Sequence, residues 1–202
     1  PSGAPVRWRI RFSPEERAER DRFFSQLPPR PVAALVLATA NPEKDWPADR
    51  YAPLADALHH LGYAVLLVGG PGPREAAAAG RVVAGARHAP LDGRGDSVRR
   101  MMWMVDGADL LVSPDTGPLH VAHALGTPVV GLYGHTNPWR VGPWRRFREL
   151  VVDRYTDPGE EPDASRYAPR YGRMELIGVE DVLEKVELAR RRYGERPEEP
   201  AW

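Results

Sequence analysis

A group of residues able to bind a charged ligand lies between two apolar stretches near the middle of the chain. The apolar run 110–112 predicts a buried strand, and Asp115, Thr116 and Gly117 predict a tight turn directly after it. A short helix of small residues follows, and Gly126 predicts its end. The sequence therefore predicts a strand, a turn and a helix whose first residues come next to a carboxylate.

Such a turn has a defined binding chemistry. The first N–H groups of a helix have no partner within the helix, and together with the positive end of the helix dipole they attract anions. Asp115 accepts hydrogen bonds from hydroxyl groups but repels a bare phosphate, so the turn suits a phosphate that is joined to a sugar. A purely structural interpretation stays open at this point, in which Asp115 or Thr116 only caps the helix.

The stretch DTGPLHVAHALGTPVVGLYGHTNP resembles the signature of the heptosyltransferases, glycosyltransferase family 9, with its D-T-G-x-x-H motif. Asp115, Thr116, Gly117 and His120 match that motif position by position, and residues 43–47 resemble the K-x-W-P segment of the same family. The resemblance extends over about residues 32–193.

The resemblance implies a fold and an activity. Family members are two-domain enzymes of the GT-B type, and this chain resembles the C-terminal half, which holds the nucleotide sugar. The implied reaction is transfer of a heptose, with inversion, from an ADP-activated donor to a lipopolysaccharide-type acceptor. A base on the N-terminal domain would deprotonate the acceptor hydroxyl. No residue of this chain matches that base, so we expect the chain alone to bind donor without efficient turnover.

Further residues are candidates for the same donor site. Lys44 could offset the negative charge of the departing diphosphate, although it could also be an ordinary surface lysine. Thr39 could donate its hydroxyl to a phosphate; the family often has two hydroxyl residues here, but the second position is Ala40. Glu75 follows a glycine-rich turn after the second strand, where an acid can bind ribose hydroxyls. His120 could meet the diphosphate or the sugar.

We expect no metal cofactor. His120 and His123 are three residues apart, which makes a metal pair conceivable. However, the chain has no Asp-x-Asp pair, the usual carboxylate clamp of metal-dependent sugar transferases, and no cysteine for a thiolate site. The helix start and Lys44 already supply positive potential.

Alternating strands and helices predict a doubly wound, Rossmann-like parallel sheet in the order 3-2-1-4-5-6. Ligands bind such sheets beyond the carboxyl ends of the strands, where the winding reverses between strands one and four. This rule places residues 39–44 opposite residues 115–117. The strands are expected at 32–38, 64–68, 88–91, 110–113, 129–133 and 150–152, and the core helices at 49–61, 74–84 and from Ser97 onward, the last with an apolar stripe at Val98, Met101, Met102 and Val105.

The sequence also predicts a division of the chain. Residues 1–30 are expected to form an extended segment, a helix over 14–26 that starts with a capping box at Ser13, and a proline-rich interdomain linker. Residues 31–178 form the nucleotide-sugar-binding domain. Residues 179–202 form a C-terminal helix over 179–193 and a disordered tail rich in proline and glutamate.

Composition narrows the possible classes of protein. The 202 residues suffice for one α/β domain, and 28 basic residues balance 28 acidic ones, so nothing points to nucleic acid. No stretch approaches the length of about 20 apolar residues needed for a membrane span, and we expect a cytoplasmic protein. Arginines and tryptophans alternate over residues 139–148, which could face an anionic acceptor or the inner membrane, or could be a solvated loop.

Two other functions stay open from the sequence. A noncatalytic module would bind nucleotide without any transfer activity. A dinucleotide-dependent oxidoreductase would prefer NAD, but the glycine-rich turn at residues 69–72 follows the second strand, whereas the dinucleotide fingerprint follows the first.

Overall fold

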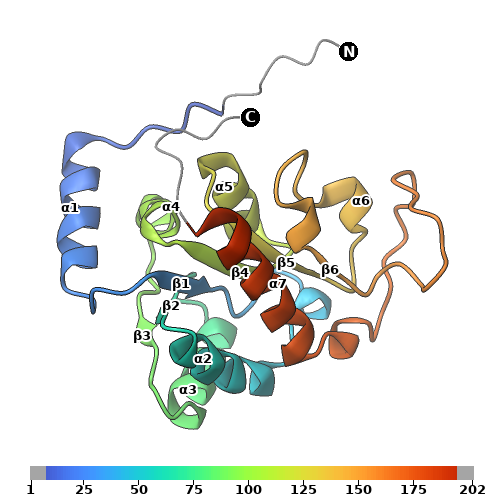
Figure 1. The fold of residues 1–202 in the computed structure, drawn as a ribbon, viewed down its shortest axis with the longest axis horizontal. Coiled ribbons are helices and arrows are strands. Elements are labelled where there is room, and N and C mark those ends of the chain that lie inside the picture. The colour runs from blue at the N-terminus through green and yellow to red at the C-terminus, as the bar shows by residue number, and fades with distance from the viewer. Residues whose placement is uncertain (1–7, 195–202) are drawn as a thin grey trace.

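The computed structural model describes residues 8–194, in which six parallel strands form one sheet (Figure 1). The strand order is β3-β2-β1-β4-β5-β6, which confirms the predicted doubly wound topology. Strands β1 and β4 lie side by side at the centre, with Leu35 paired to Val112. The strands are β1 (Val32–Leu35), β2 (Ala64–Leu67), β3 (Leu91–Asp92), β4 (Leu110–Pro114), β5 (Val129–Tyr133) and β6 (Val152–Asp153).

Helices cover both faces of the sheet. On one face α2 packs against α3 and α7; on the other α4 packs against α5, and α1 lies outside α4 (Figure 1). The central strands β1, β4 and β5 are buried along their whole length, which is why they read as continuous apolar runs. The helices are α1 (Pro14–Ser25), α2 (Tyr51–His60), α3 (Pro73–Gly85), α4 (Val98–Gly107), α5 (Gly117–Leu125), α6 (Pro138–Val141) and α7 (Val179–Tyr193), with short 3-10 turns at 42–44, 48–50, 148–150 and 174–176.

The start of α1 confirms the predicted capping box. The Ser13 hydroxyl accepts the Glu16 N–H at 3.2 Å, and the Glu16 carboxylate accepts the Ser13 N–H at 2.7 Å. Residues 8–13 precede this helix and belong to no strand of the sheet. The helix packs on α4 through an edge-to-face contact between Phe23 and Trp103.

The edge strands differ from the prediction. The third strand is Leu91–Asp92 and not 88–91, and the sixth is Val152–Asp153 and not 150–152. Each edge strand pairs with only one neighbouring strand, and each is only two residues long. A strand of two residues is too short to be located from the alternation of apolar and polar residues. At the centre, β1 ends at Leu35, although the Val36 N–H still donates to the Val112 carbonyl at 3.0 Å.

The predicted apolar stripe of α4 was partly wrong. Trp103, Met104 and Val105 are buried, whereas the Val98 side chain is 67% exposed. This helix packs against both α1 and α5. Its buried face therefore includes Trp103, which contacts Phe23 of α1. Val98 and Met101 line a cavity at the carboxyl edge of the sheet.

The C-terminal helix α7 covers the predicted residues and packs against β5 and β6. The Asp181 carboxylate accepts the Gly178 N–H at 2.8 Å and so closes the first turn. The predicted disordered tail lies outside the described residues, and the division at residues 30 and 178 stays a prediction. Within residues 8–194, no helix combines the length and apolar character needed to cross a membrane.

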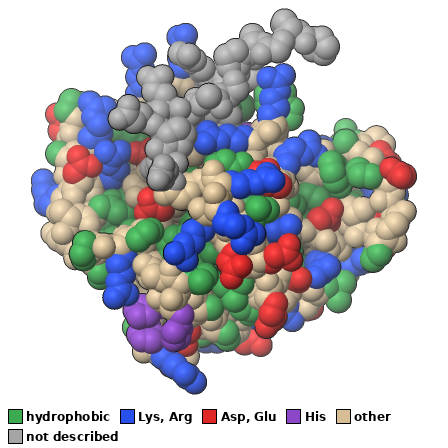
Figure 2. All heavy atoms as spheres, in the orientation of Figure 1, with side chains coloured by type: hydrophobic (Ala, Val, Ile, Leu, Met, Phe, Trp, Pro, Cys, Tyr) green, Lys and Arg blue, Asp and Glu red, His purple; other side chains and the backbone are tan. Residues whose placement is uncertain are grey.

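Histidines gather at one corner of the molecule, near α2, where Figure 2 shows them in purple. His59 and His88 stack with their rings 3.7 Å apart, and the edge of His60 faces His88 at 5.7 Å. An Arg30 guanidinium nitrogen lies 3.3 Å from His59 Nε2. This corner lies away from the residues that the sequence assigns to a site.

Candidate functional site

The turn between β4 and α5 has the predicted form. Thr116 is extended, with φ −142°, and α5 runs from Gly117 to Leu125. Gly126 follows as the C-terminal cap, and its φ of +79° suits glycine. No side chain caps this helix; the Thr116 hydroxyl lies 3.2 Å from the Ser113 hydroxyl instead. The purely structural interpretation of Asp115 and Thr116 as caps is therefore wrong. Pro118 has no N–H, so the Gly117 and Leu119 N–H groups are the donors at this helix start, and no side chain caps them.

Asp115 is the centre of a compact ion cluster at this turn. Its Oδ2 atom lies 2.7 Å from Lys44 Nζ and accepts the Thr136 hydroxyl at 2.9 Å, while its Oδ1 atom lies 3.3 Å from His120 Nε2. The Asp115 side chain is only 8% exposed. Burial by itself raises the pKa of this carboxyl, but the contacts with His120, Lys44 and Thr136 outweigh it and lower the pKa to about 2. Asp115 is therefore an anion held by three donors.

Lys44 reaches Asp115 because the loop after β1 is anchored. The Asn41 carboxamide oxygen accepts the Glu43 N–H at 3.2 Å and starts the 3-10 turn that ends at Lys44. Just beyond, Trp46 is buried, and its indole N–H donates to the Ile177 carbonyl at 2.9 Å. The strand order predicts that the loops after β1 and β4 lie side by side. The contact between Lys44 and Asp115 joins these two loops.

A cavity of about 430 Å³ adjoins the cluster at the carboxyl edge of the sheet. Four of the predicted site residues line it: Thr39, Glu75, Thr116 and Gly117. Val98 and Met101 of α4 add apolar surface to the same cavity, as a pocket for a flat ring requires. The seven predicted site residues thus form two adjoining groups. Four line this cavity, and the other three are the cluster of Lys44, Asp115 and His120. The Asp115–Thr116 peptide bond connects the two groups.

Two of the lining side chains are engaged with their own loops. The Thr39 hydroxyl donates to the Asn41 carbonyl at 2.5 Å. Glu75 Oε1 accepts the Gly70 N–H at 3.1 Å, and the carboxylate lies so close to this loop that a Cβ at Gly69 would come within 2.6 Å of it. The glycines after β2 therefore let the Glu75 carboxylate approach the backbone at the cavity wall.

His123 does not join His120. His123 is buried, and its Nε2 atom lies 2.8 Å from the Trp144 carbonyl, whereas His120 Nε2 faces Asp115. Burial lowers its pKa, so the ring is neutral near pH 7. Between residues 8 and 194, no three His, Cys, Asp or Glu side chains are grouped closely enough to hold a metal ion.

The sequence analysis missed residues that follow the ends of β1 and β5. Thr136 donates directly to Asp115, and the buried His135 has its Nε2 atom 3.5 Å from Asn41 Nδ2. Their position in the sequence could have identified them, because residues that directly follow parallel strands lie at the same edge of the sheet, where ligands bind.

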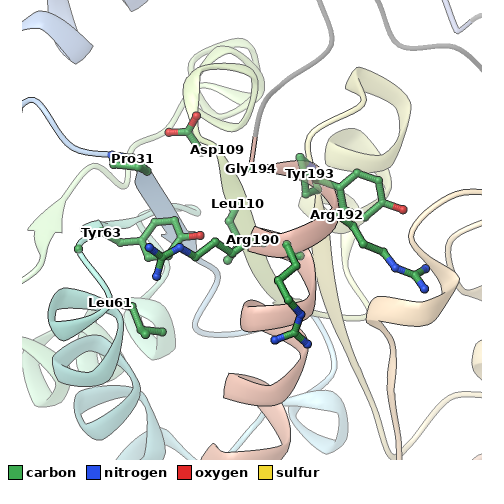
Figure 3. Close-up of a pocket in the computed structure, with 13 residues that line it drawn as sticks. Pro31, Leu61, Tyr63, Asp109, Leu110, Arg190, Arg192, Tyr193 and Gly194 are labelled. Carbon is green, nitrogen blue, oxygen red and sulfur yellow. The ribbon is translucent and has the colours of Figure 1, made fainter.

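A second hollow, of about 750 Å³, lies at the opposite edge of the sheet (Figure 3). Pro31, Tyr63, Asp109 and the end of α7 line it. The Asp109 carboxylate accepts the Val32 N–H at 2.7 Å and so belongs to the sheet edge. None of the predicted site residues lies there, and ligands of doubly wound sheets bind at the carboxyl ends of the strands, so we assign the site to the Asp115 edge.

The strand order defines a Rossmann-like domain, and the candidate site lies at its β1–β4 switch point. The family model of glycosyltransferase family 9 (heptosyltransferase) matches residues 2–163. The chain belongs to this family, as the D-T-G-x-x-H motif predicts.

Two curated relatives and one solved structure place the chain within the family. It is 28% identical over 149 residues to the lipopolysaccharide core heptosyltransferase OpsX of Haemophilus influenzae, a match that covers 73% of this chain and 42% of the relative. It is 33% identical over 147 residues to lipopolysaccharide heptosyltransferase 3 of Escherichia coli, covering 71% and 42%. The structure of E. coli ADP-heptose lps heptosyltransferase II superposes with a TM-score of 0.70 at 25% identity, covering 89% of this chain and 52% of that one. The chain thus matches about half or less of the length of these relatives.

Proposed function

We propose that this chain is the donor-binding domain of an inverting glycosyltransferase that uses a nucleotide sugar, namely ADP-heptose, and acts on a lipopolysaccharide-type acceptor. One observation carries the proposal: the Lys44–Asp115 pair adjoins both the uncapped start of α5 and the cavity lined by Thr39, Glu75 and Thr116. The start of α5 suits a diphosphate, the cavity suits a ribose, and the Asp115 carboxylate suits the hydroxyl groups of a sugar. The name of one structural relative, an ADP-heptose heptosyltransferase, supports the choice of donor.

Each group has a role in this proposal. The nucleoside occupies the cavity, with Glu75 accepting ribose hydroxyls and Thr39 near the phosphates. The diphosphate lies at the start of α5, where the N–H groups of Thr116 and Gly117 and the ammonium of Lys44 stabilise the negative charge that develops as the sugar leaves. Positive charge from the chain itself makes a metal ion unnecessary.

Asp115 orients both the donor and Lys44. Because its pKa is about 2, the carboxylate is ionised at any physiological pH and accepts hydrogen bonds from sugar hydroxyls. His120, whose side chain is 52% exposed, stands beside it and contacts the sugar or the diphosphate. Thr136 fixes the carboxylate from the opposite side.

We propose that the residues that bind and activate the acceptor belong to the other domain of the enzyme. In the family, a base on the other domain deprotonates the acceptor hydroxyl, and no residue of this chain matches it. We therefore expect the chain by itself to bind donor without efficient turnover. A lipopolysaccharide-type acceptor is a glycolipid, so the proposal places the protein in the cytoplasm, at the cytoplasmic face of the inner membrane.

Calorimetric titration with ADP, UDP, GDP and NAD tests the proposal. We expect ADP to bind most tightly of the four. A clear preference for NAD would contradict the donor-binding role and favour a dinucleotide-dependent function. Nucleotide binding without transfer when the complete enzyme is given ADP-heptose and acceptor would favour a noncatalytic module.

A further inference from the structure

Three exposed aromatic rings and three arginines form one surface on and around α6. The exposed fractions are 41% for Trp139, 47% for Trp144 and 73% for Tyr167. Side chains of this size are costly to leave in water, so their grouping indicates a contact surface. We call it the arginine–aromatic surface and define it by Trp139, Arg140, Trp144, Arg145, Arg148 and Tyr167.

Each of the three arginines lies over one of the three rings. The guanidinium carbons of Arg140, Arg145 and Arg148 lie 3.8, 4.1 and 4.6 Å from the ring centroids of Tyr167, Trp144 and Trp139, respectively. A guanidinium that lies over a ring at this distance keeps N–H groups able to bind another acceptor.

These arginines differ from those of the neighbouring loop in having no carboxylate partner among the described residues. Arg166, Arg170 and Arg173 all form ion pairs, with Glu160, with both Asp157 and Glu160, and with Asp157, respectively. Within residues 8–194, the side chains of Arg140, Arg145 and Arg148 interact with these rings and form no hydrogen bond or ion pair. Residues 138–148 contain no Asp or Glu at all. The surface is therefore a local excess of positive charge on a protein whose formal net charge is zero.

The loop that carries this surface is held firmly from below. Phe147 is fully buried and packs edge-to-face on Tyr193, and the Trp144 carbonyl is 2.8 Å from His123 Nε2. Asn137 begins α6 by accepting the Trp139 N–H at 3.0 Å. Because these anchors are buried, Trp144 and Arg145 face outward from a fixed backbone, and little conformational entropy is lost when they bind.

We propose that the arginine–aromatic surface binds an anionic lipid bilayer. Indole rings favour the boundary between headgroups and acyl chains, and guanidinium groups pair with lipid phosphates in two-point hydrogen bonds. A soluble anion would satisfy the arginines but would leave the indoles in water. A bilayer satisfies both at once.

The arginine–aromatic surface lies close in sequence to the candidate site, so membrane binding there would also orient that site. Thr136, which donates to Asp115, is followed after one residue by α6, at the carboxyl end of β5 (Figure 1). Membrane contact here would hold the donor cleft beside the bilayer. This orienting role rests on the proposed function, in which the acceptor is a glycolipid; the lipid contact itself does not.

Sedimentation with vesicles tests the proposal. The chain should bind vesicles of phosphatidylcholine and phosphatidylglycerol and should bind pure phosphatidylcholine far less. Each arginine near a charged bilayer contributes about 1 kcal/mol, so Arg145→Gln with Arg148→Gln should weaken binding about 30-fold. The matched control is Arg81→Gln with Arg87→Gln, two exposed arginines in and after α3, and this variant should bind within about twofold of the parent, as surface charges distant from the bilayer do.

Two further measurements separate the possible outcomes. Bromine atoms on the acyl chains should quench tryptophan emission, and Trp144→Ala should reduce that quenching. Equal binding to both kinds of vesicle, equal losses in the two double variants, or displacement by phosphate beyond that by chloride at the same ionic strength would overturn the proposal. Titration of the same variants with ADP reports separately on the proposed function, since the arginine–aromatic surface lies outside the nucleotide cavity.

Discussion

Removal of the Lys44 ammonium should destabilise the fold as well as the site. In Lys44→Met the chain keeps a similar side-chain length but leaves Asp115, 8% exposed, without its only ammonium contact among the described residues. The contacts of Asp115 lower its pKa from 3.8 to about 2, which corresponds to about 2 kcal/mol of stability at neutral pH. Lys44 provides the ammonium contact, which is one part of this total, so we expect a loss of about 1–2 kcal/mol, or about 3–6 °C in melting temperature for a domain of this size.

The pH dependence of this loss distinguishes it from a general packing defect. Because the folded pKa of Asp115 lies below the unfolded one, its contribution is complete above about pH 5 and is lost as the pH falls toward 2. The stability difference between the parent and Lys44→Met, measured by urea unfolding, should therefore shrink on acidification.

The chain offers a matched control, since Lys185 is its second and last lysine. Lys185 lies 3.7 Å from Glu184, whose side chain is 74% exposed, and such a pair contributes little. Lys185→Met should therefore unfold close to the parent. Equal stability of all three proteins at pH 7, or a loss in Lys44→Met that persists unchanged at low pH, would refute the reasoning.

Three other predictions follow from described contacts. Thr116→Leu should weaken ADP more than adenosine in calorimetric titrations, because the bulk falls at the start of α5; equal losses would mean that this turn does not meet phosphate. ADP affinity should be the same in excess EDTA as in Mg²⁺ or Mn²⁺, and affinity that collapses in EDTA and returns with metal would contradict a metal-independent site. Burial, together with the electrostatic effect of the neighbouring His88 and Arg30, lowers the pKa of His59, so folding should weaken as the pH drops below about 6.5; His59→Gln should flatten the stability profile between pH 7.5 and 5.5, and an unchanged profile would exclude His59 as the cause.

The central topology could be predicted from the sequence because several independent patterns agree. The runs around Leu35, Val112 and Val130 are apolar throughout, and right-handed crossovers leave one favoured order for strands that alternate with helices. Local chemistry was equally informative at the capping box of Ser13 and at the Gly126 helix end. The edge strands and the buried face of α4 depend on tertiary neighbours, which no short window of sequence contains.

The candidate site was predictable to a similar degree. The strand order alone brings the loops of Lys44 and Asp115 together. The ion pair between them was not predicted, because the sequence analysis assigned one residue to the diphosphate and the other to the sugar. Thr136 was missed because a single threonine after a strand resembles any loop residue, and the hydroxyl contact of Thr39 with its own loop depends on a backbone turn that the sequence does not specify.

The affinity ratio of ADP to adenosine in the parent, Lys44→Met and Lys185→Met tests the central claim most directly. Both ligands share the nucleoside, so the ratio isolates the binding of the diphosphate. A lost charge-assisted contact costs about 1.5–3 kcal/mol, so Lys44→Met should lower the ratio about 10-fold or more, and Lys185→Met should leave it unchanged. If the ratio in Lys44→Met equals that of the parent, Lys44 and the start of α5 do not form the diphosphate site, and the donor-binding assignment of this edge is wrong.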